Sequence, residues 1–235
     1  MSVSPPPAPA PAREPSHEPS RQVIEGDGVA WLAATPLPAT HALVTSLPDG
    51  SEVKPHDLET WTRWFIDTVA LATRQVHEGA VAIFFQSDVR HEGRWVDKGS
   101  LVSQGASGAG AACLFHKIVC RVPAGTATKG RPAYAHLQCF SRGLRLKVPQ
   151  AGPDVLPALG EMSWARAMGT AACEEVCRFL LASTACRVVV DPFCGMGTML
   201  AVANAFGLDA VGVERSPKRA AAARALRYRR GHGLG

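Results

Sequence analysis

The sequence predicts an α/β fold in which a mostly parallel sheet carries helices on both faces. Two patterns indicate it. Between 41 and 86 an apolar strand, an amphipathic helix and a second apolar strand follow one another, and between 169 and 228 helices and strands alternate again. Such alternation is typical of parallel sheets, whose strands are joined through helices. The chain has 235 residues, of which 46% are hydrophobic, so one domain with a full core is expected.

The first half of the chain contains the clearest single elements. Residues 41–46 (HALVTS) form an apolar run between prolines, which predicts a short buried strand. Asp57 is a suitable N-cap for a helix to Val76, in which apolar residues recur every three or four positions. The continuous apolar run at 80–86 predicts a strand that is covered on both faces.

The middle of the chain is predicted to be less regular. Residues 99–110 are rich in Gly, Ser and Ala and predict a loop, and residues 149–157 are bounded by prolines and predict a linker. Two strands are expected between them, at 114–122 and 134–141. The last part of the chain predicts helices at 169–181, 197–206 and 216–228 around strands at 187–190 and 210–213.

The composition of the chain bears on its location. Residues 1–20 contain seven prolines and are expected to be a disordered leader, because they cannot bury enough apolar surface to offset the entropy of ordering. The sequence has no run of about 18 apolar residues, so no contact with a membrane is expected. Seven scattered cysteines, an odd number, favour free thiols and, with the lack of a secretory signal, a cytoplasmic protein.

Positive charge is concentrated in one segment. Residues 98–153 hold eight Lys and Arg and no Asp or Glu, whereas residues 1–97 hold 7 basic and 13 acidic side chains. Phosphate attracts such a segment over a long range with little need for sequence specificity. The segment favours nucleic acid as a partner, with an ordinary solvated surface as the alternative. Its candidate substrate-binding residues are Lys117, Arg121, Lys129 and Arg131.

The most informative segment combines a strand end, a glycine-containing turn and a helix start. It reads VVVDPFCGMGT at 188–198, and the next predicted strand leads to Glu214. Ligands of open α/β sheets bind at the carboxyl ends of such strands. Gly195 and Gly197 let the backbone approach a ligand, and Glu214 suits a grip on the hydroxyls of a ribose. The segment therefore predicts a ligand that contains adenosine.

The residues of this turn disfavour a pyrophosphate. A dinucleotide site would have a third glycine where this chain has Leu200, and a phosphate-binding loop would have Lys followed by Ser or Thr after Gly197. Asp191 suits an ammonium group or braces the amides of the turn, and it is unsuited to phosphate. S-adenosylmethionine, which has an adenosine, an ammonium group and no phosphate, is the predicted cofactor. A structural turn in another kind of α/β protein is the alternative.

Residues 191–198 (DPFCGMGT) resemble the cofactor motif of the amino-group DNA methyltransferases and of related RNA methyltransferases. The order of parts is similar to the circularly permuted, beta-class-like group of this family, in which the catalytic half precedes the cofactor half. Gly26-Asp27 and the loop TSLPD at 45–49 stand where that group has a Gly-Asp pair and its catalytic loop. The resemblance covers about residues 22–230.

The resemblance implies a Rossmann-like class I methyltransferase domain with a seven-stranded sheet. That domain would comprise residues 21–235, with the catalytic and substrate-binding half at 21–150 and the cofactor-binding half at 151–235. Its activity would be the transfer of a methyl group from S-adenosylmethionine to a base nitrogen of a nucleic acid. Because the sulfonium of the donor is already activated, no metal ion is expected. A partner subunit or a homodimer is left open.

The resemblance also implies roles for individual residues. The catalytic residues would be Ser46, Pro48 and Asp49. The cofactor would be held by Asp27, Thr45, Asp191, Pro192, Phe193, Gly195, Gly197, Thr198 and Glu214.

The catalytic loop departs from the family at two positions. Leu47 stands where the family has its first proline, and Asp49 stands where it has an aromatic residue that stacks on the extruded base. Asp49 is then either a hydrogen-bond acceptor for the target amine, with Ser46 in support, or a simple turn residue before Gly50.

Two departures shift the expected substrate from DNA toward structured RNA such as transfer RNA. The first is the loss of the aromatic residue at position 49, for which Trp95 and Trp164 are possible replacements unless they pack in the core or on the cofactor. The second is an interval of only about twenty residues before the cofactor half, too short for the target-recognition insert of the DNA enzymes. The alternatives are a DNA amino-methyltransferase and a non-catalytic protein that uses the fold for RNA binding or assembly.

Overall fold

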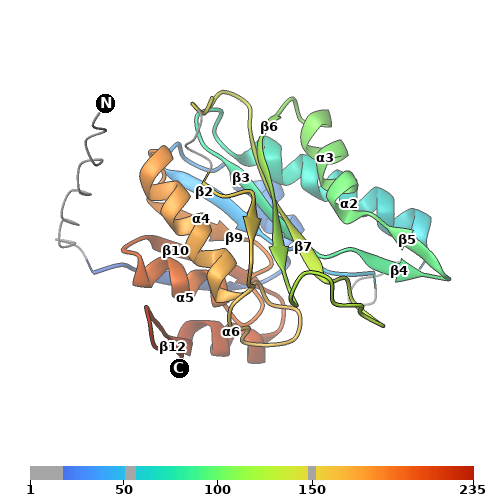
Figure 1. Cartoon of the computed structure of the whole chain (residues 1–235). Coiled ribbons are helices and arrows are strands. Elements are labelled where there is room, and N and C mark those ends of the chain that lie inside the picture. Colours follow the sequence, from blue (N-terminus) through green and yellow to red (C-terminus); the bar gives the residue numbers. More distant parts are fainter. Residues whose placement is uncertain (1–17, 51–56, 148–151) are drawn as a thin grey trace, which may run out of the picture.

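The structure of the chain, a computed structural model, describes residues 18–50, 57–147 and 152–235. Its centre is a sheet of eight strands (Figure 1). In spatial order these strands are β1 (Arg21–Glu25), β10 (Asp209–Glu214), β9 (Val188–Asp191), β2 (His41–Thr45), β3 (Ala82–Gln86), β7 (Tyr134–Ser141), β6 (Ala112–Cys120) and β8 (Val155–Leu156). Neighbouring strands are parallel, except that β7 is antiparallel to both β3 and β6. The prediction of a mostly parallel sheet is confirmed.

The sheet has one strand more than the seven expected. The additional strand is β8, in which Val155 and Leu156 pair with Ile118 and Val119 of β6. This segment was predicted as part of a linker. A strand of two residues at the edge of a sheet has no hydrophobic alternation long enough to be recognised in a sequence.

Helices cover the two faces of the sheet in two groups. α1 (Gly28–Ala34), α2 (Leu58–Gln75) and α3 (Lys98–Gly108) contact one another in succession. α4 (Thr170–Ser183), α5 (Thr198–Ala205) and α6 (Pro217–Ala225) form a second group. The two groups lie on opposite sides of the sheet (Figure 1). The strands between them are therefore apolar on both faces, as β3 with its five buried residues shows.

The predicted helix caps are present. Asp57 begins α2, where its carboxylate accepts a hydrogen bond from the backbone N–H of Thr60 at 2.8 Å. Ser216 begins α6 and accepts from the N–H of Arg219 at 3.5 Å. Each side chain satisfies one of the backbone donors that a helix start leaves without a partner.

The prediction of a loop at 99–110 is wrong, because this segment forms α3. Asp97 caps the helix by accepting from the backbone N–H of Ser100 at 2.8 Å. The glycines permit close packing: a Cβ at Gly105 would lie 2.6 Å from the carbonyl oxygen of Ile66 in α2, and a Cβ at Gly99 would lie 3.0 Å from the ring of His136. The glycine-rich composition suggested a loop, but in the structure the glycines let α3 pack closely against α2 and against β7 of the sheet.

Several elements of the structure were not predicted. β1 and α1 flank Gly26-Asp27, and a hairpin of β4 (Val89–His91) and β5 (Arg94–Val96) precedes α3. The last helix was predicted to extend to 228 but ends at Ala225. The chain then forms a second hairpin, β11 (Tyr228–Arg229) and β12 (Gly233–Leu234). Gly231 in its turn and Gly233 at the start of β12 have positive φ, a backbone that a right-handed helix does not allow.

The predicted leader falls almost wholly in residues 1–17, outside the described residues. Within the described ranges, no helix is both long and apolar enough to cross a membrane.

Candidate functional site

One cleft of about 750 Å³ lies where β9, β10, β2 and β3 end. Its volume is typical of sites for small-molecule cofactors. Twelve of the predicted site residues line it: Asp27, Ser46, Pro48, Asp49, Arg121, Arg131, Asp191, Pro192, Phe193, Gly195, Thr198 and Glu214. Four others, which the structure also describes, do not line it: Thr45, Lys117, Lys129 and Gly197.

Asp191 is the last residue of β9 and is held by two hydrogen bonds. Its Oδ1 accepts from the hydroxyl of Thr45 at 2.6 Å and from the backbone N–H of Phe193 at 3.1 Å. Thr45 ends the neighbouring strand β2 and is fully buried. Thr45 therefore positions the carboxylate of Asp191. It does not line the cleft itself, although it was expected from the sequence to hold the cofactor directly.

The carboxyl of Asp191 is buried near a second carboxylate, that of Glu214. The side chain is only 5% exposed, and its burial raises its pKa from the ordinary 3.8 to about 7. The hydrogen bonds from Thr45 and Phe193 act against this rise, whereas the nearby carboxylate of Glu214 adds to it. A cationic group in the cleft would favour the ionised form of Asp191, and the cleft therefore suits a ligand with positive charge at this end.

Two glycines shape the turn after β9. Gly195 has φ +55° and lines the cleft, where a Cβ would lie 3.4 Å from the indole nitrogen of Trp164. Gly197 has φ +81°, and a Cβ there would lie 2.8 Å from the Cβ of Ala223 in α6. Because Gly195 has no side chain, nothing projects from this position into the cleft. The absence of a side chain at Gly197 instead allows α6 to pack against the turn.

Glu214 and Asp27 line the cleft at the neighbouring strand ends. Oε1 of Glu214 accepts from the backbone N–H of Ser216 at 2.7 Å, and Nε of Arg219 lies 3.5 Å from the same oxygen. Oδ1 of Asp27 caps α1 by accepting from the N–H groups of Val29 and Ala30, both at 2.9 Å. Both carboxylates are thereby fixed in orientation at the rim of the cleft.

The catalytic-loop candidates Ser46, Pro48 and Asp49 follow β2 directly and line the cleft. Asp49 is paired with a residue that the sequence did not single out: Nζ of Lys98 donates to its Oδ1 at 2.6 Å. Lys98 is the first residue of α3, is 3% exposed and also lines the cleft. Because 99–110 was predicted as a loop, nothing in the sequence pattern placed Lys98 near Asp49.

Asp88 is a second functional candidate that the sequence did not reveal. It lines the cleft and accepts from the backbone N–H of Lys98 at 2.9 Å and from the indole N–H of Trp95 at 3.0 Å. Nε2 of His136 lies 3.1 Å from both of its oxygens. Burial favours a higher pKa, but His136 together with the hydrogen bonds from Trp95 and Lys98 outweighs it, and the pKa of Asp88 is lowered. Asp88 is thus an ionised anchor for the start of α3.

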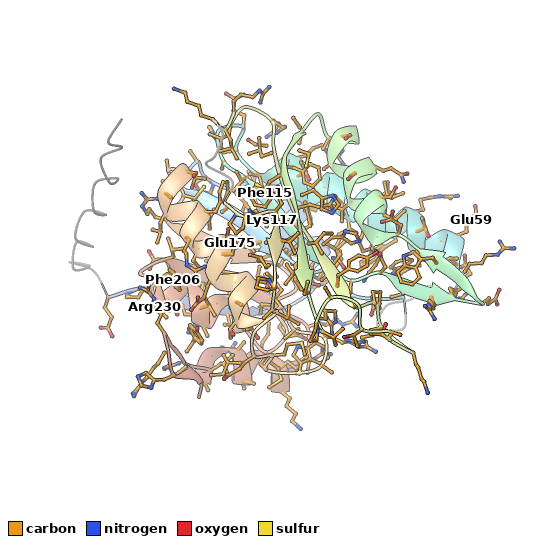
Figure 2. All side chains as sticks on the ribbon, in the orientation of Figure 1. Glu59, Phe115, Lys117, Glu175, Phe206 and Arg230 are labelled. Carbon is orange, nitrogen blue, oxygen red and sulfur yellow. The ribbon has the colours of Figure 1, made fainter. Side chains whose placement is uncertain are left out.

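The structure separates the four predicted basic residues into two pairs. Arg121 and Arg131 line the cleft, whereas Lys129 is exposed away from its lining. Lys117 is fully buried, donates to the carbonyl oxygen of Pro153 at 2.6 Å and lies 3.6 Å from a carboxylate oxygen of Glu175. Figure 2 shows Lys117 and Glu175 beside each other between β6 and α4. A buried ammonium cannot contact the phosphates of a substrate, so the prediction for Lys117 is wrong.

The donor set of the cleft fits S-adenosylmethionine. The two carboxylates at the ends of β9 and β10 suit an ammonium group and ribose hydroxyls, and no part of the turn at 191–198 offers a cation to a phosphate. Trp164, whose ring has the guanidinium of Arg219 at 5.4 Å, and Phe193 supply aromatic walls. The residues present are therefore compatible with a cationic adenosine ligand.

Comparisons with known proteins give structural neighbours only. No protein-family model matches the chain, and no curated protein sequence matches it. A candidate DNA modification methylase from Thermus thermophilus, solved in complex with S-adenosyl-L-methionine, is 21% identical, with a TM-score of 0.67 over 87% of this chain and 92% of that one. The PvuII DNA methyltransferase, described as cytosine-N4-specific, is 14% identical, with a TM-score of 0.68 over 90% of this chain and 89% of that one.

A third neighbour, M1.HpyAVI in complex with SAM, is 11% identical, with a TM-score of 0.58 over 87% of this chain and 97% of that one. All three similarities extend over most of both chains and concern the arrangement of the elements, at identities too low to carry more. This chain therefore has the α/β fold of the DNA methyltransferases to which it is similar.

Proposed function

We propose that this chain is an S-adenosylmethionine-dependent methyltransferase that acts on an exocyclic amino nitrogen of a base in nucleic acid. The observation that carries the proposal is the cleft, in which the buried carboxyl of Asp191 faces the same space as Glu214 and the loop at 46–49. The residues that we propose to bind the cofactor and those that we propose to take part in the reaction thereby share one cavity. The neighbours support the proposal, because two of them were solved with this cofactor.

The cofactor, when bound, supplies an activated methyl group on a sulfonium. The protein's task is then to place the amine in line with that methyl group and to stabilise the positive charge that passes to the nitrogen. The loop at 46–49 follows β2 and is tied to the cofactor end through the Thr45–Asp191 hydrogen bond. Ser46 and Asp49 are the acceptors that would orient the amine. As the methyl group moves from sulfur to nitrogen the cofactor is left as a neutral thioether, and the methylated amine would pass one proton to the carboxylate of Asp49 and from there to water.

We infer that DNA is the leading substrate, in place of the RNA preferred from the sequence. That preference relied partly on the short interval before the cofactor half. However, this chain covers 89% and 92% of two neighbours described as DNA-modifying, so its length does not distinguish it from them. RNA is the alternative outcome of the transfer assay below.

The order of the strands supports the circularly permuted class. β2 and β3, which lead to the proposed catalytic side, precede β9 and β10 in the chain, although β2 and β9 are neighbours in the sheet. A partner subunit or a homodimer stays a prediction, for which sedimentation of the full chain is the test.

Cofactor binding is tested by isothermal titration calorimetry. Asp191→Ala should abolish measurable binding of S-adenosylmethionine, and Glu214→Gln should weaken it about tenfold, since a hydrogen bond to a charged group contributes about 1.5–3 kcal/mol. Unchanged affinity in both variants would reject the site.

Activity is tested by transfer of a tritiated methyl group to genomic DNA and, in parallel, to total RNA. Nucleoside mass spectrometry of the labelled sample then identifies the product. Ser46→Ala and Asp49→Ala should lower turnover at least tenfold while cofactor affinity stays within a few-fold. If the wild type binds the cofactor but labels neither nucleic acid, the chain is a binding protein and the catalytic proposal fails.

A further inference from the structure

We propose that Lys98 is a specificity-determining residue, whose ammonium donates a hydrogen bond to the ring nitrogen beside the target amino group. This inference rests on the proposed function and extends it to a residue outside every recognised motif. With Asp49 as the neighbouring acceptor, the protein would offer a donor and an acceptor side by side. That arrangement is complementary to a base edge on which an amino group lies next to an unprotonated ring nitrogen.

The location of Lys98 is unfavourable for a merely structural lysine. Its side chain is 4% exposed, and removing an ammonium from water costs several kcal/mol even when it is paired. It also occupies the first position of α3, where the helix dipole disfavours positive charge. A residue that opposes two local preferences at once is expected mainly at functional sites, and Lys98 lies in the wall of the cleft.

The surroundings of Lys98 hold it in place. Asp88 accepts from its backbone N–H at 2.9 Å, and Asp97 caps the same turn of α3. Asp88 is in turn fixed by the indole of Trp95 and by His136. The ammonium is therefore presented to the cleft from a braced backbone, which is the preorganisation that recognition of a small planar group requires.

The pairing with Asp49 also offsets the positive charge that Lys98 would bring to the cleft. The reaction moves a positive charge from sulfur to nitrogen, and an ammonium alone in the cleft would oppose that charge. The carboxylate of Asp49, 2.6 Å from the Nζ of Lys98, offsets it. The pair is nearly neutral as a unit and can contribute hydrogen bonds to a base without adding net charge.

The pair also fits the departure of the loop from the family pattern. Asp49 stands where an aromatic residue would stack on the base. Recognition through the base edge would supply part of the orientation that stacking on that residue provides elsewhere. Trp64 and Phe85, which also line the cleft, offer apolar surface for the faces of the base.

The test compares two substrates on two proteins. An oligonucleotide with a natural target base is set against one in which the ring nitrogen is replaced by C–H, 1-deazaadenine for adenine or 3-deazacytosine for cytosine. Single-turnover methylation by the wild type should fall about 10–100-fold on the deaza base, as for loss of a hydrogen bond to a charged donor. Lys98→Met should be slow on both bases, and its ratio between them should be about 10–100-fold smaller than that of the wild type. Comparing ratios removes the different intrinsic reactivity of the two amines.

Three controls make the result specific. Lys218→Met removes an exposed lysine of α6 that does not line the cleft and should behave as the wild type. Lys98→Gln keeps a neutral donor and should retain part of the discrimination. Fluorescence anisotropy without any methyl donor should show the same deaza effect on oligonucleotide affinity in the wild type and its loss in Lys98→Met.

The outcomes separate this inference from the proposed function. If the wild type methylates nucleic acid but Lys98→Met suffers the same deaza penalty, Lys98 does not contact the ring nitrogen and the inference is overturned. A loss of activity accompanied by a lower melting temperature and by weaker cofactor binding would identify Lys98 as structural. If the wild type methylates no nucleic acid, the proposed function fails, and the inference fails with it.

Discussion

The hydroxyl of Thr45 lies 2.6 Å from the carboxylate of Asp191 and joins the ends of two neighbouring parallel strands, β2 and β9. Thr45 immediately precedes the loop that carries Ser46 and Asp49, and Asp191 immediately precedes the glycine turn. One buried hydrogen bond therefore connects the proposed reacting side of the cleft with its cofactor side. Residues 146 positions apart in the chain are held in register by it.

Thr45→Val should weaken binding of S-adenosylmethionine about tenfold near pH 7. The bond from Thr45 lowers the pKa of Asp191, so its loss leaves less of the carboxylate ionised and less able to bind a cation. Calorimetric titrations between pH 6 and pH 8 should show the pH midpoint of binding move upward by about one pH unit. Thr45→Ser keeps the hydroxyl and should resemble the wild type. A Thr45→Val protein with unaltered affinity and midpoint would show that the bond has no role at the cofactor.

Binding of S-adenosylmethionine to the wild type should weaken as the pH falls below about 7. Burial raises the pKa of Asp191 to about 7, so below that value a proton must leave before the carboxylate can pair with a cation. Affinity should then fall up to tenfold per pH unit. Asp191→Asn should bind weakly at every pH and lose this dependence. A wild-type affinity that is flat between pH 5.5 and 7.5 would contradict the assignment.

Asp191→Asn should also make the folded protein more stable at pH 8. The folded-state pKa of about 7 lies above the ordinary 3.8, so the folded chain binds more protons than the unfolded chain between these values. The free energy of unfolding therefore decreases as the pH rises from about 4 to about 7. Removing the buried charge should recover about 2–4 kcal/mol at pH 8 and little at pH 4. Denaturant unfolding at both pH values measures this difference, and an equal change at both would refute it.

Gly197→Ala should destabilise the protein more than Gly207→Ala. Both glycines have positive φ, +81° and +78°, so both substitutions carry the backbone strain of about 1–2 kcal/mol. Only at Gly197 would the new Cβ collide, because it would lie 2.8 Å from the Cβ of Ala223. A Cβ at Gly207 would have no atom within 4 Å. Urea unfolding should therefore give Gly197→Ala at least about 1 kcal/mol less stability than its matched control. Equal losses would show that α6 moves away without cost.

The sequence was sufficient where a pattern is local. The apolar runs of β2, β3, β9 and β10 identify the strands of the cleft, and the string at 191–198 identifies the turn that forms one wall. Because the carboxyl ends of parallel strands meet at one edge, Asp191 and Glu214 could be placed together without coordinates. Asp27 was placed with them only by the family resemblance, because β1, the strand that precedes it, was not predicted.

The sequence was insufficient where a residue acts through tertiary packing. The glycines of α3 resemble a loop until α2 and His136 are seen against them, and with that helix the position of Lys98 was lost. Lys117 lies in a basic segment that suggested a surface, yet its side chain points inward to Glu175. Net charge along a chain does not tell which side of a strand a lysine occupies, and only one of the two sides here faces water.

Lys117 is buried whereas Arg131 is exposed at the cleft, so variants of the two residues test which basic side chains contact nucleic acid. Arg131 lies at the cleft, so Arg131→Ala should weaken binding to an oligonucleotide about 3–10-fold at about 100 mM salt and reduce the slope of log affinity against log salt by about one. Lys117→Met should leave both quantities unchanged, because its ammonium is buried. It should instead cost about 1–3 kcal/mol of stability, since Glu175 keeps only Arg178 as an ionic partner within 4 Å among the described residues.

Anisotropy titrations at several salt concentrations, together with urea unfolding, distinguish the two effects. A folded Lys117→Met protein that loses affinity and salt dependence like Arg131→Ala would show that β6 turns this side chain toward the substrate in solution. A stability loss in Arg131→Ala equal to that of Lys117→Met, without any change in salt slope, would assign Arg131 to the fold through its hydrogen bond to the carbonyl oxygen of Ala165. We therefore expect Arg131→Ala to affect binding and Lys117→Met to affect stability, because Arg131 is exposed at the cleft and Lys117 is buried.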